Sequence, residues 1–224
     1  MNAKRAVCTG IVAAVLGFGP TFASADPYFA LFYGKAQTDL SQGELNTIAE
    51  DLTAALGGTP PTGVSDVNDT DTAWGAQIGY RFNRWVAAEI GYVDFGKPSY
   101  YANLVSDFGA GPEGYTVRSR FIVTGPTLAV VPTIPLGERF DLYARAGLFL
   151  AETRFQLGAD FPPDSVTVDS RADTREWFGG LGFAWNINDN YAVRIEGTYF
   201  PEVGDDDETG ENDIALIAIG VMFR

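Results

Sequence analysis

Bulky apolar side chains alternate with small or polar ones along almost the whole chain after residue 25. Successive side chains of a β-strand point to opposite faces, so this period of two predicts strands with one apolar and one polar face. The segment AWGAQIGYRFNRWVAAEIGYVDFG, residues 73–96, shows the pattern on both sides of a turn at Asn83-Arg84. No stretch after residue 25 has the 18 or more apolar residues of a membrane helix. Strands must therefore provide the fold.

Eight segments carry the alternation, and the connections between them alternate in length. Long connections cover residues 38–71, 97–114, 157–173 and 203–211, whereas short turns lie at residues 83–84, 136–138 and 188–190. Long and short connections therefore fall at opposite ends, which is the layout of a bacterial outer-membrane barrel. The predicted strands cover residues 27–37, 72–82, 85–96, 115–132, 139–156, 174–187, 191–202 and 212–223.

The two faces of these strands differ in chemistry. One face is bulky and almost free of charge, with residues such as Trp74, Ile90 and Leu148; the other mixes charged residues with many glycines. A soluble barrel would turn the apolar face inward. The glycines favour the opposite orientation, because a narrow interior must fit long Arg and Glu side chains beside something small. Aromatic residues near both ends of the strands are typical of membrane interfaces. We therefore predict an all-β, eight-stranded antiparallel up-and-down transmembrane β-barrel; a secreted soluble binding barrel remains the alternative if the orientation is wrong.

The first 25 residues differ from the rest. Lys4 and Arg5 precede an apolar run that ends before Gly19-Pro20, and Ala23-Ser24-Ala25 matches a signal-peptide cleavage site. We predict a signal peptide over residues 1–25 and a barrel domain over residues 26–224. The barrel domain has 13 basic and 29 acidic residues, a net charge of −16, so we expect no nucleic-acid partner. The single cysteine lies before residue 26, so no disulfide is expected.

Three stretches are similar to the OmpA-type outer-membrane barrel family. DTAWGAQIGYRFNRWVAAEIGYVDFGK resembles its second and third strands, NDNYAVRIEGTYF its seventh and IAIGVMFR its last. The resemblance follows the strand order over the whole barrel domain and stops at the eighth strand, so we expect no peptidoglycan-binding domain. It implies that Phe223, although followed by Arg224, is the terminal aromatic signal for the barrel assembly machinery. It also implies outer-membrane lipid and lipopolysaccharide as surroundings and partners.

Charged residues on the polar face form the candidate site. Charges confined inside a barrel must be paired, so we predict a lumen ion-pair network. In the resembled family a comparable network is thought to plug or gate the lumen, and Glu89 and Arg194 match its positions. A further carboxylate position of that network is Ala184 here. The predicted network comprises Arg81, Glu89, Arg118, Arg120, Arg145, Arg194 and Glu196.

The role predicted from these features is structural, with envelope stabilisation and acidic loops presented outside. A narrow or gated pore for small or hydrophobic molecules is the alternative, although an eight-stranded interior is only wide enough for its own side chains. Barrel enzymes that modify lipopolysaccharide depend on histidine as a base, and this chain has none. We expect neither a catalytic site nor a cofactor.

Two loop features complete the predictions. Residues 41–58 predict a short amphipathic helix over the barrel mouth, with Ser41 and Glu44 as a capping box and Leu45, Ile48, Leu52 and Leu56 on one face. It could pack on the rim or act as a lid. Acidic loop residues predict a solvated face, with calcium or bridging to lipopolysaccharide phosphates as alternatives, but they lack the spacing of an EF-hand. These are Asp66, Asp69, Asp71, Asp160, Asp164, Asp169, Asp173 and the run 205–208.

Overall fold

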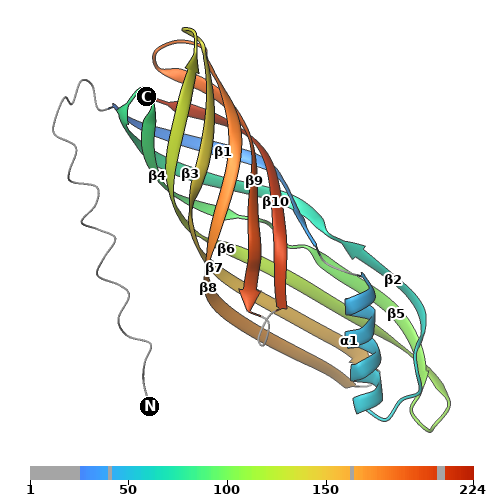
Figure 1. Ribbon diagram of the computed structural model, residues 1–224. Helices are drawn as coiled ribbons and strands as arrows, with labels where there is room; N and C mark the ends of the chain where they lie inside the picture. Colours follow the sequence, from blue (N-terminus) through green and yellow to red (C-terminus); the bar gives the residue numbers. More distant parts are fainter. Residues whose placement is uncertain (1–25, 40–41, 162–163, 206–209) are drawn as a thin grey trace, which may run out of the picture.

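The computed structural model describes residues 26–39, 42–161, 164–205 and 210–224, so the predicted signal peptide lies outside the described residues. The described part contains ten strands and one helix (Figure 1). Their bounds are β1 Asp26–Thr38, α1 Gln42–Ala55, β2 Thr62–Asn68, β3 Thr70–Asn83, β4 Val86–Asp94, β5 Ser99–Asp107, β6 Pro112–Leu136, β7 Phe140–Phe161, β8 Asp164–Asn186, β9 Tyr191–Asp205 and β10 Gly210–Phe223.

Eight of these strands form a closed antiparallel ring. Its order is β1, β3, β4, β6, β7, β8, β9 and β10, and β10 pairs back onto β1 from Phe29 with Phe223 to Thr38 with Ile214. Closure gives every wall strand two neighbours, so backbone donors and acceptors are satisfied without water. The predicted eight-stranded up-and-down barrel is confirmed. No helix in the described ranges is long and apolar enough to cross a membrane.

Tight turns close one end of the barrel. The Asn83 side-chain oxygen accepts hydrogen bonds from the backbone N–H groups of Trp85 and Val86, at 2.8 and 3.0 Å. Asn188 does the same for Asn190 and Tyr191, both at 2.9 Å. Such Asx turns let the chain reverse within two or three residues. The described chain starts and ends at this same end (Figure 1).

The predicted orientation of the strand faces is confirmed along the barrel. On β7, Phe140, Leu142 and Leu150 are exposed on the outside, whereas Tyr143 and Arg145 are buried inside. The outward face of β7 stays apolar from residue 140 to 150, about the 9–11 residues with which a tilted strand crosses a bilayer. Beyond it the outward face becomes charged. An exposed apolar band of this height is what lipid requires.

Three of the predicted loops are wrong. Residues 62–68 and 99–107 form β2 and β5, and residues 157–173 belong to the outer halves of β7 and β8. These strands and the outer half of β6 form a five-stranded sheet, in the order β2-β5-β6-β7-β8, that projects beyond the ring (Figure 1). We call it the extension. Its strands also alternate, but their outward face is polar because it lies above the lipid, so a search for apolar alternation misses them.

The predicted helix is confirmed as α1, and it packs on the inward face of the extension. Leu45 and Ala49 are buried against Tyr100, Leu104 and neighbouring residues. The predicted apolar stripe is only partly correct, because Ile48 and Leu56 are exposed while Ala49 and Thr53 are buried. The small side chains at positions 49 and 53 let the helix approach the sheet. Ser41 of the predicted capping box lies outside the described residues.

Polar contacts fix the docked position of α1. The Tyr100 hydroxyl donates to Asn46 Oδ1 at 2.9 Å, and the Tyr115 hydroxyl shares a hydrogen bond with the Thr53 hydroxyl. Loss of solvation raises the pKa of Tyr115 above its ordinary value, so it stays a neutral partner. The helix therefore covers the extension and is held there by both apolar and polar contacts.

Replacing Leu45 by Asp should detach α1 from the extension without opening the barrel. Losing the burial of one Leu, about 1.5–3 kcal/mol, corresponds to a roughly 10- to 150-fold loss of hydrogen-exchange protection in α1. Ile48→Asp introduces the same charge at a position that is 41% exposed, and should match the wild type. Equal protection in the two variants would contradict the docked position.

Candidate functional site in the barrel interior

Two arginines and two glutamates meet in the middle of the barrel and are all buried. Arg145 on β7 contacts Glu89 on β4 at 2.9 Å (Nε to Oε2) and Glu196 on β9 at 2.7 Å (Nη1 to Oε1). Arg194 on β9 contacts the same two carboxylates, Glu89 at 2.8 Å and Glu196 at 3.5 Å. Each cation thus bridges both anions, and the charges sum to zero. We call these four residues the ion-pair layer.

Two tyrosines add hydrogen bonds to the carboxylates. The Tyr28 hydroxyl donates to Glu89 Oε1 at 2.7 Å, and the Tyr143 hydroxyl donates to Glu196 Oε2 at 2.9 Å. Arg194 Nε donates to the Tyr143 oxygen at 3.0 Å. Buried charges are stable only when such additional bonds satisfy their remaining lone pairs and protons.

Two glycines make room for these tyrosine rings. A Cβ atom on Gly79 would lie 2.0 Å from the Tyr28 ring, and one on Gly182 would lie 2.2 Å from the Tyr143 ring. Both glycines face inward on strands next to the tyrosines, in the registers Tyr28 with Gly79 and Tyr143 with Gly182. The glycines of the polar face therefore leave the space that the inward-facing tyrosine rings occupy, as a narrow lumen requires.

Gln77 fills the remaining space beside the ion-pair layer. With its amide oxygen turned toward Arg145, it accepts from both Nη atoms at 3.0 Å. Arg145 also lies 5.4 Å above the Phe178 ring, and Arg194 lies 4.3 Å above the Tyr143 ring. The guanidinium groups are thus enclosed on their faces as well as along their edges.

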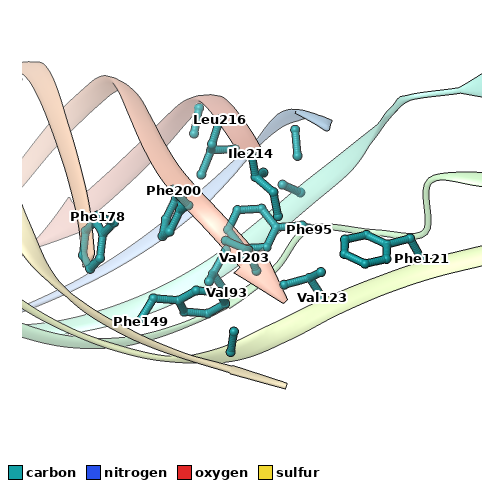
Figure 2. Packing of buried hydrophobic residues seen from close by; sticks show 14 of the residues in the cluster. Val93, Phe95, Phe121, Val123, Phe149, Phe178, Phe200, Val203, Ile214 and Leu216 are labelled. Carbon is teal, nitrogen blue, oxygen red and sulfur yellow. The ribbon is translucent and has the colours of Figure 1, made fainter. Parts of the chain in front are cut away.

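A layer of aromatic rings seals the lumen on the side of the long connections. Phe95, Phe149, Phe178 and Phe200 pack with centroid distances of 4.9–5.6 Å (Figure 2). We call these four residues the aromatic layer. The aromatic layer differs from the polar interior predicted from the sequence. The alternation of side chains nevertheless indicates it, because positions 149, 178 and 200 share their face with Arg145, Gly180 and Glu196.

The interior is more open toward the turn end. Arg81 is half-buried there and lines a recess with Asp26 and Arg224. Between this recess and the ion-pair layer lies a cavity of about 10 Å³, room for about one water, bordered by Ala184 and Asp141. Ala184 faces inward opposite Arg194. The resemblance to OmpA-type barrels implies a carboxylate at this position. In this chain the second carboxylate of the ion-pair layer is Glu196.

Arg118 and Arg120 do not lie in the lumen, which corrects their predicted place in the network. Both are exposed on the outward face of the extension, because the buried residues of this part of β6 are Val117, Ser119 and Phe121. The predicted inward direction holds only where lipid surrounds the strand, and the outer part of β6 lies beyond the lipid. Above the membrane the polar side chains point outward to water.

The predicted acidic loops belong largely to strands. Asp66 lies on β2, and Asp160, Asp169 and Asp173 lie on the outer parts of β7 and β8. Residues 206–208 fall outside the described part of the chain. Among the residues that are described, no group of three or more Cys, Asp or Glu side chains is arranged to hold a metal ion.

The family model of the OmpA-like transmembrane domain matches residues 24–224 of the chain. Outer membrane protein A of Serratia marcescens is 22% identical over 151 residues, which is 67% of this chain and 38% of that protein. Outer membrane protein A of Yersinia pseudotuberculosis is 24% identical over 151 residues, which is 67% of this chain and 39% of that protein. The match thus spans well under two thirds of these relatives.

Among solved structures, the chain is similar to the outer membrane protease OmpT from Escherichia coli. The TM-score is 0.47 at 11% sequence identity, and the alignment covers 93% of this chain and 99% of that one.

Truncating Glu89 to Ala should lower the free energy of unfolding by about 3–5 kcal/mol, since it leaves buried guanidinium charge uncompensated. Urea unfolding of the refolded barrel in vesicles measures this. Glu138→Ala, in an exposed turn at the end of the barrel, is the control and should change stability by less than about 0.5 kcal/mol. An E89A midpoint equal to that of the wild type would show that the ion-pair layer adds no stability.

Proposed function

Because the chain belongs to the OmpA-like transmembrane domain family, we propose that it is a structural component of the envelope. It is an integral β-barrel protein of the bacterial outer membrane, with the turn end toward the periplasm and the extension outside. The observation that carries the structural role is the lumen, which is filled by two successive layers of side chains. A filled barrel stabilises the membrane that it crosses without letting solutes pass.

The lumen contents argue against the alternative of a narrow pore. A solute would have to displace four ion pairs whose partners are almost completely buried, and then four packed rings. Breaking one buried pair costs about 3–5 kcal/mol, and the rings would lose their apolar burial as well. No feature of the described residues favours passage over closure.

We propose no enzymatic activity. The chain has no histidine, and the buried carboxylates of Glu89 and Glu196 are held by arginines in a closed interior where a substrate cannot reach them. An unchanged lipid A mass spectrum on overexpression agrees with this proposal, and a new lipid A species would contradict it.

Purified wild-type protein should show no single-channel steps in planar bilayers. Glu89→Ala should also stay closed, because the aromatic layer remains intact above the altered ion-pair layer. Steps in the wild type would favour the pore. Steps in E89A alone would mean that the ion pairs gate a channel and that the aromatic layer does not seal it.

A deletion strain tests the envelope role directly. Uptake of a hydrophobic fluorescent dye should rise when the gene is removed, and the closed wild-type protein should restore the barrier. Unchanged uptake in the deletion strain would overturn the structural role, whatever the conductance result.

We also propose that Phe223 is the residue read by the barrel assembly machinery. It ends β10 on the lipid-facing side, is 39% exposed and lies beside Phe29 and Tyr191. Arg224 lies beyond the strand, where its Nη2 donates to Asn186 Oδ1 at 2.7 Å.

Deleting residues 223 and 224 should lower the yield of heat-modifiable barrel in the outer membrane severalfold. Deleting Arg224 alone is the matched control, because it leaves an aromatic C-terminus and should keep the yield of the wild type. Equal yields from both deletions would contradict the role of Phe223.

A further inference from the structure

The outer half of β8 forms an open edge of the extension. β8 pairs with β9 only from Gly179 to Asn186, whereas its pairing with β7 continues as far as Asp164. Among the described residues, the stretch 164–178 therefore has a neighbouring strand on one side only, and β8 and β2 form the two margins of the extension (Figure 1). The backbone donors and acceptors along such an edge are a template for a further strand.

The backbone groups that point to this edge belong to the odd-numbered residues. The Asn186 N–H donates to the carbonyl oxygen of Arg139, just before β7, at 2.7 Å, and the Ile187 N–H donates to that of Tyr191, at the start of β9, at 2.9 Å. Even-numbered residues of β8 thus bond toward β7. The register of β7 with β8 has no shift, so the N–H and C=O groups of the odd-numbered residues from 165 to 177 point away from β7, to the open edge.

The other margin of the extension is protected. β2 is only seven residues long, from Thr62 to Asn68. The Gln42 side chain of α1 also covers it at Ser65, where it donates to the backbone oxygen and to the hydroxyl, both at 2.9 Å. Short strands and covering elements are usual ways to block an edge. Within the described ranges no side chain covers the backbone of β8 in this manner, so β8 is the edge that remains open.

The side chains along the open edge carry alternating charges. On the neighbouring strand they meet like charges, because Arg171 lies directly opposite Arg154, and Asp173 directly opposite Glu152. The four charges sum to zero, but like charges at directly opposite positions destabilise a sheet. A strand on the other side of β8 relieves both pairs if it brings the opposite charge to each position. The edge charges are, in order, Asp169, Arg171, Asp173 and Arg175.

This order of charges selects an antiparallel partner. When a copy of residues 165–177 is laid antiparallel along β8 with Ala172 opposite Ala172, Asp169 faces Arg175 and Arg171 faces Asp173. Every edge charge then lies opposite a charge of the other sign, and the odd-numbered residues of both strands exchange the backbone hydrogen bonds. The sequence of β8 is thus its own antiparallel complement and defines the chemistry of the segment that fits.

We propose that the outer half of β8 binds an extended segment of another protein, which joins the sheet as an antiparallel strand. This segment carries Asp or Glu opposite Arg171, and Arg or Lys opposite Asp173. Main-chain hydrogen bonds supply the affinity, and the charges select sequence and register. A second copy in the same membrane cannot be the occupant, because the β8 strands of two upright barrels run in the same direction. The proposal uses neither the sealed lumen nor the envelope role, so either can fail alone.

The test compares two synthetic peptides that differ only in the order of two charges. The first has the sequence of residues 165–177, SVTVDSRADTREW. The second, SVTVDSDARTREW, exchanges the central Arg and Asp and keeps composition and net charge. In neutral detergent micelles the refolded protein should bind the first peptide about tenfold more tightly, since the exchange turns two opposite-charge pairs into like-charge pairs. Fluorescence anisotropy of labelled peptides measures this, and equal binding would overturn the proposal.

Arg171→Asp with Asp173→Arg should reverse the preference, so that the second peptide binds about tenfold more tightly than the first. The double variant keeps the net charge and gives Arg154 and Glu152 neighbours of opposite sign, so it should fold at least as well as the wild type. Heat-modifiable mobility checks the folding. An unchanged preference would place the peptide elsewhere on the protein and contradict the proposed edge.

Backbone methylation of the first peptide tests strand addition without any change to the protein. N-methyl groups on the peptide residues that correspond to Arg171 and Asp173 replace N–H groups that face β8, and should abolish binding. N-methyl groups on those that correspond to Ser170 and Ala172 lie on the far side of the added strand and should leave binding unchanged. Equal effects of the two methylations would exclude strand addition.

Sedimentation of the purified protein tests the competing occupant, a second copy in an inverted orientation. The protein alone should be monomeric in micelles. Dimers that persist in the presence of saturating first peptide would leave no open edge for a partner and would overturn the proposal.

Discussion

An eight-stranded ring leaves an interior only as wide as the side chains that fill it, and this limit shapes the whole molecule. Any charge that faces inward must find its counter-charge within the ring, because neither water nor lipid can replace it. Glu89 and Glu196 meet this condition through two arginines that each bridge both carboxylates. The narrow interior also explains the glycines at positions 79 and 182, because any larger side chain there would collide with the rings of Tyr28 and Tyr143.

The parts of the fold that lipid surrounds could be predicted from the sequence. Lipid requires an apolar outer surface, and successive side chains of a strand point to opposite faces. Because Ile90 and Ile195 must face the lipid, their neighbours Glu89 and Arg194 must face the lumen. The ring order then brings β4, β7 and β9 onto one enclosed space. For this reason the sequence alone places Glu89, Arg145, Arg194 and Glu196 in the lumen, although it does not predict their individual pairs.

The parts outside the lipid could not be predicted in the same way. Above the apolar band the outward face meets water, so Arg118 and Arg120 point outward although they resemble lumen charges in type. The strands β2 and β5 depend on pairing with distant partners, since residues 62–68 bond to 99–107, and no local pattern reveals such a register. The aromatic layer was missed for a different reason, because the bulk of a phenylalanine suggests lipid more readily than lumen.

The ion-pair layer also bears on how the barrel folds. Glu89 and Arg194 are 105 residues apart in the sequence. Arg145 lies on β7, which β6 separates from β4 and β8 separates from β9. Closing so long a loop is slow and entropically unfavourable, so the ion-pair layer is complete only when β4, β7 and β9 surround one space. A wall that lacked β4 would leave the two arginines with only one carboxylate, Glu196, between them. Uncompensated buried charge is costly, so the ion-pair layer favours the complete barrel over a partial one.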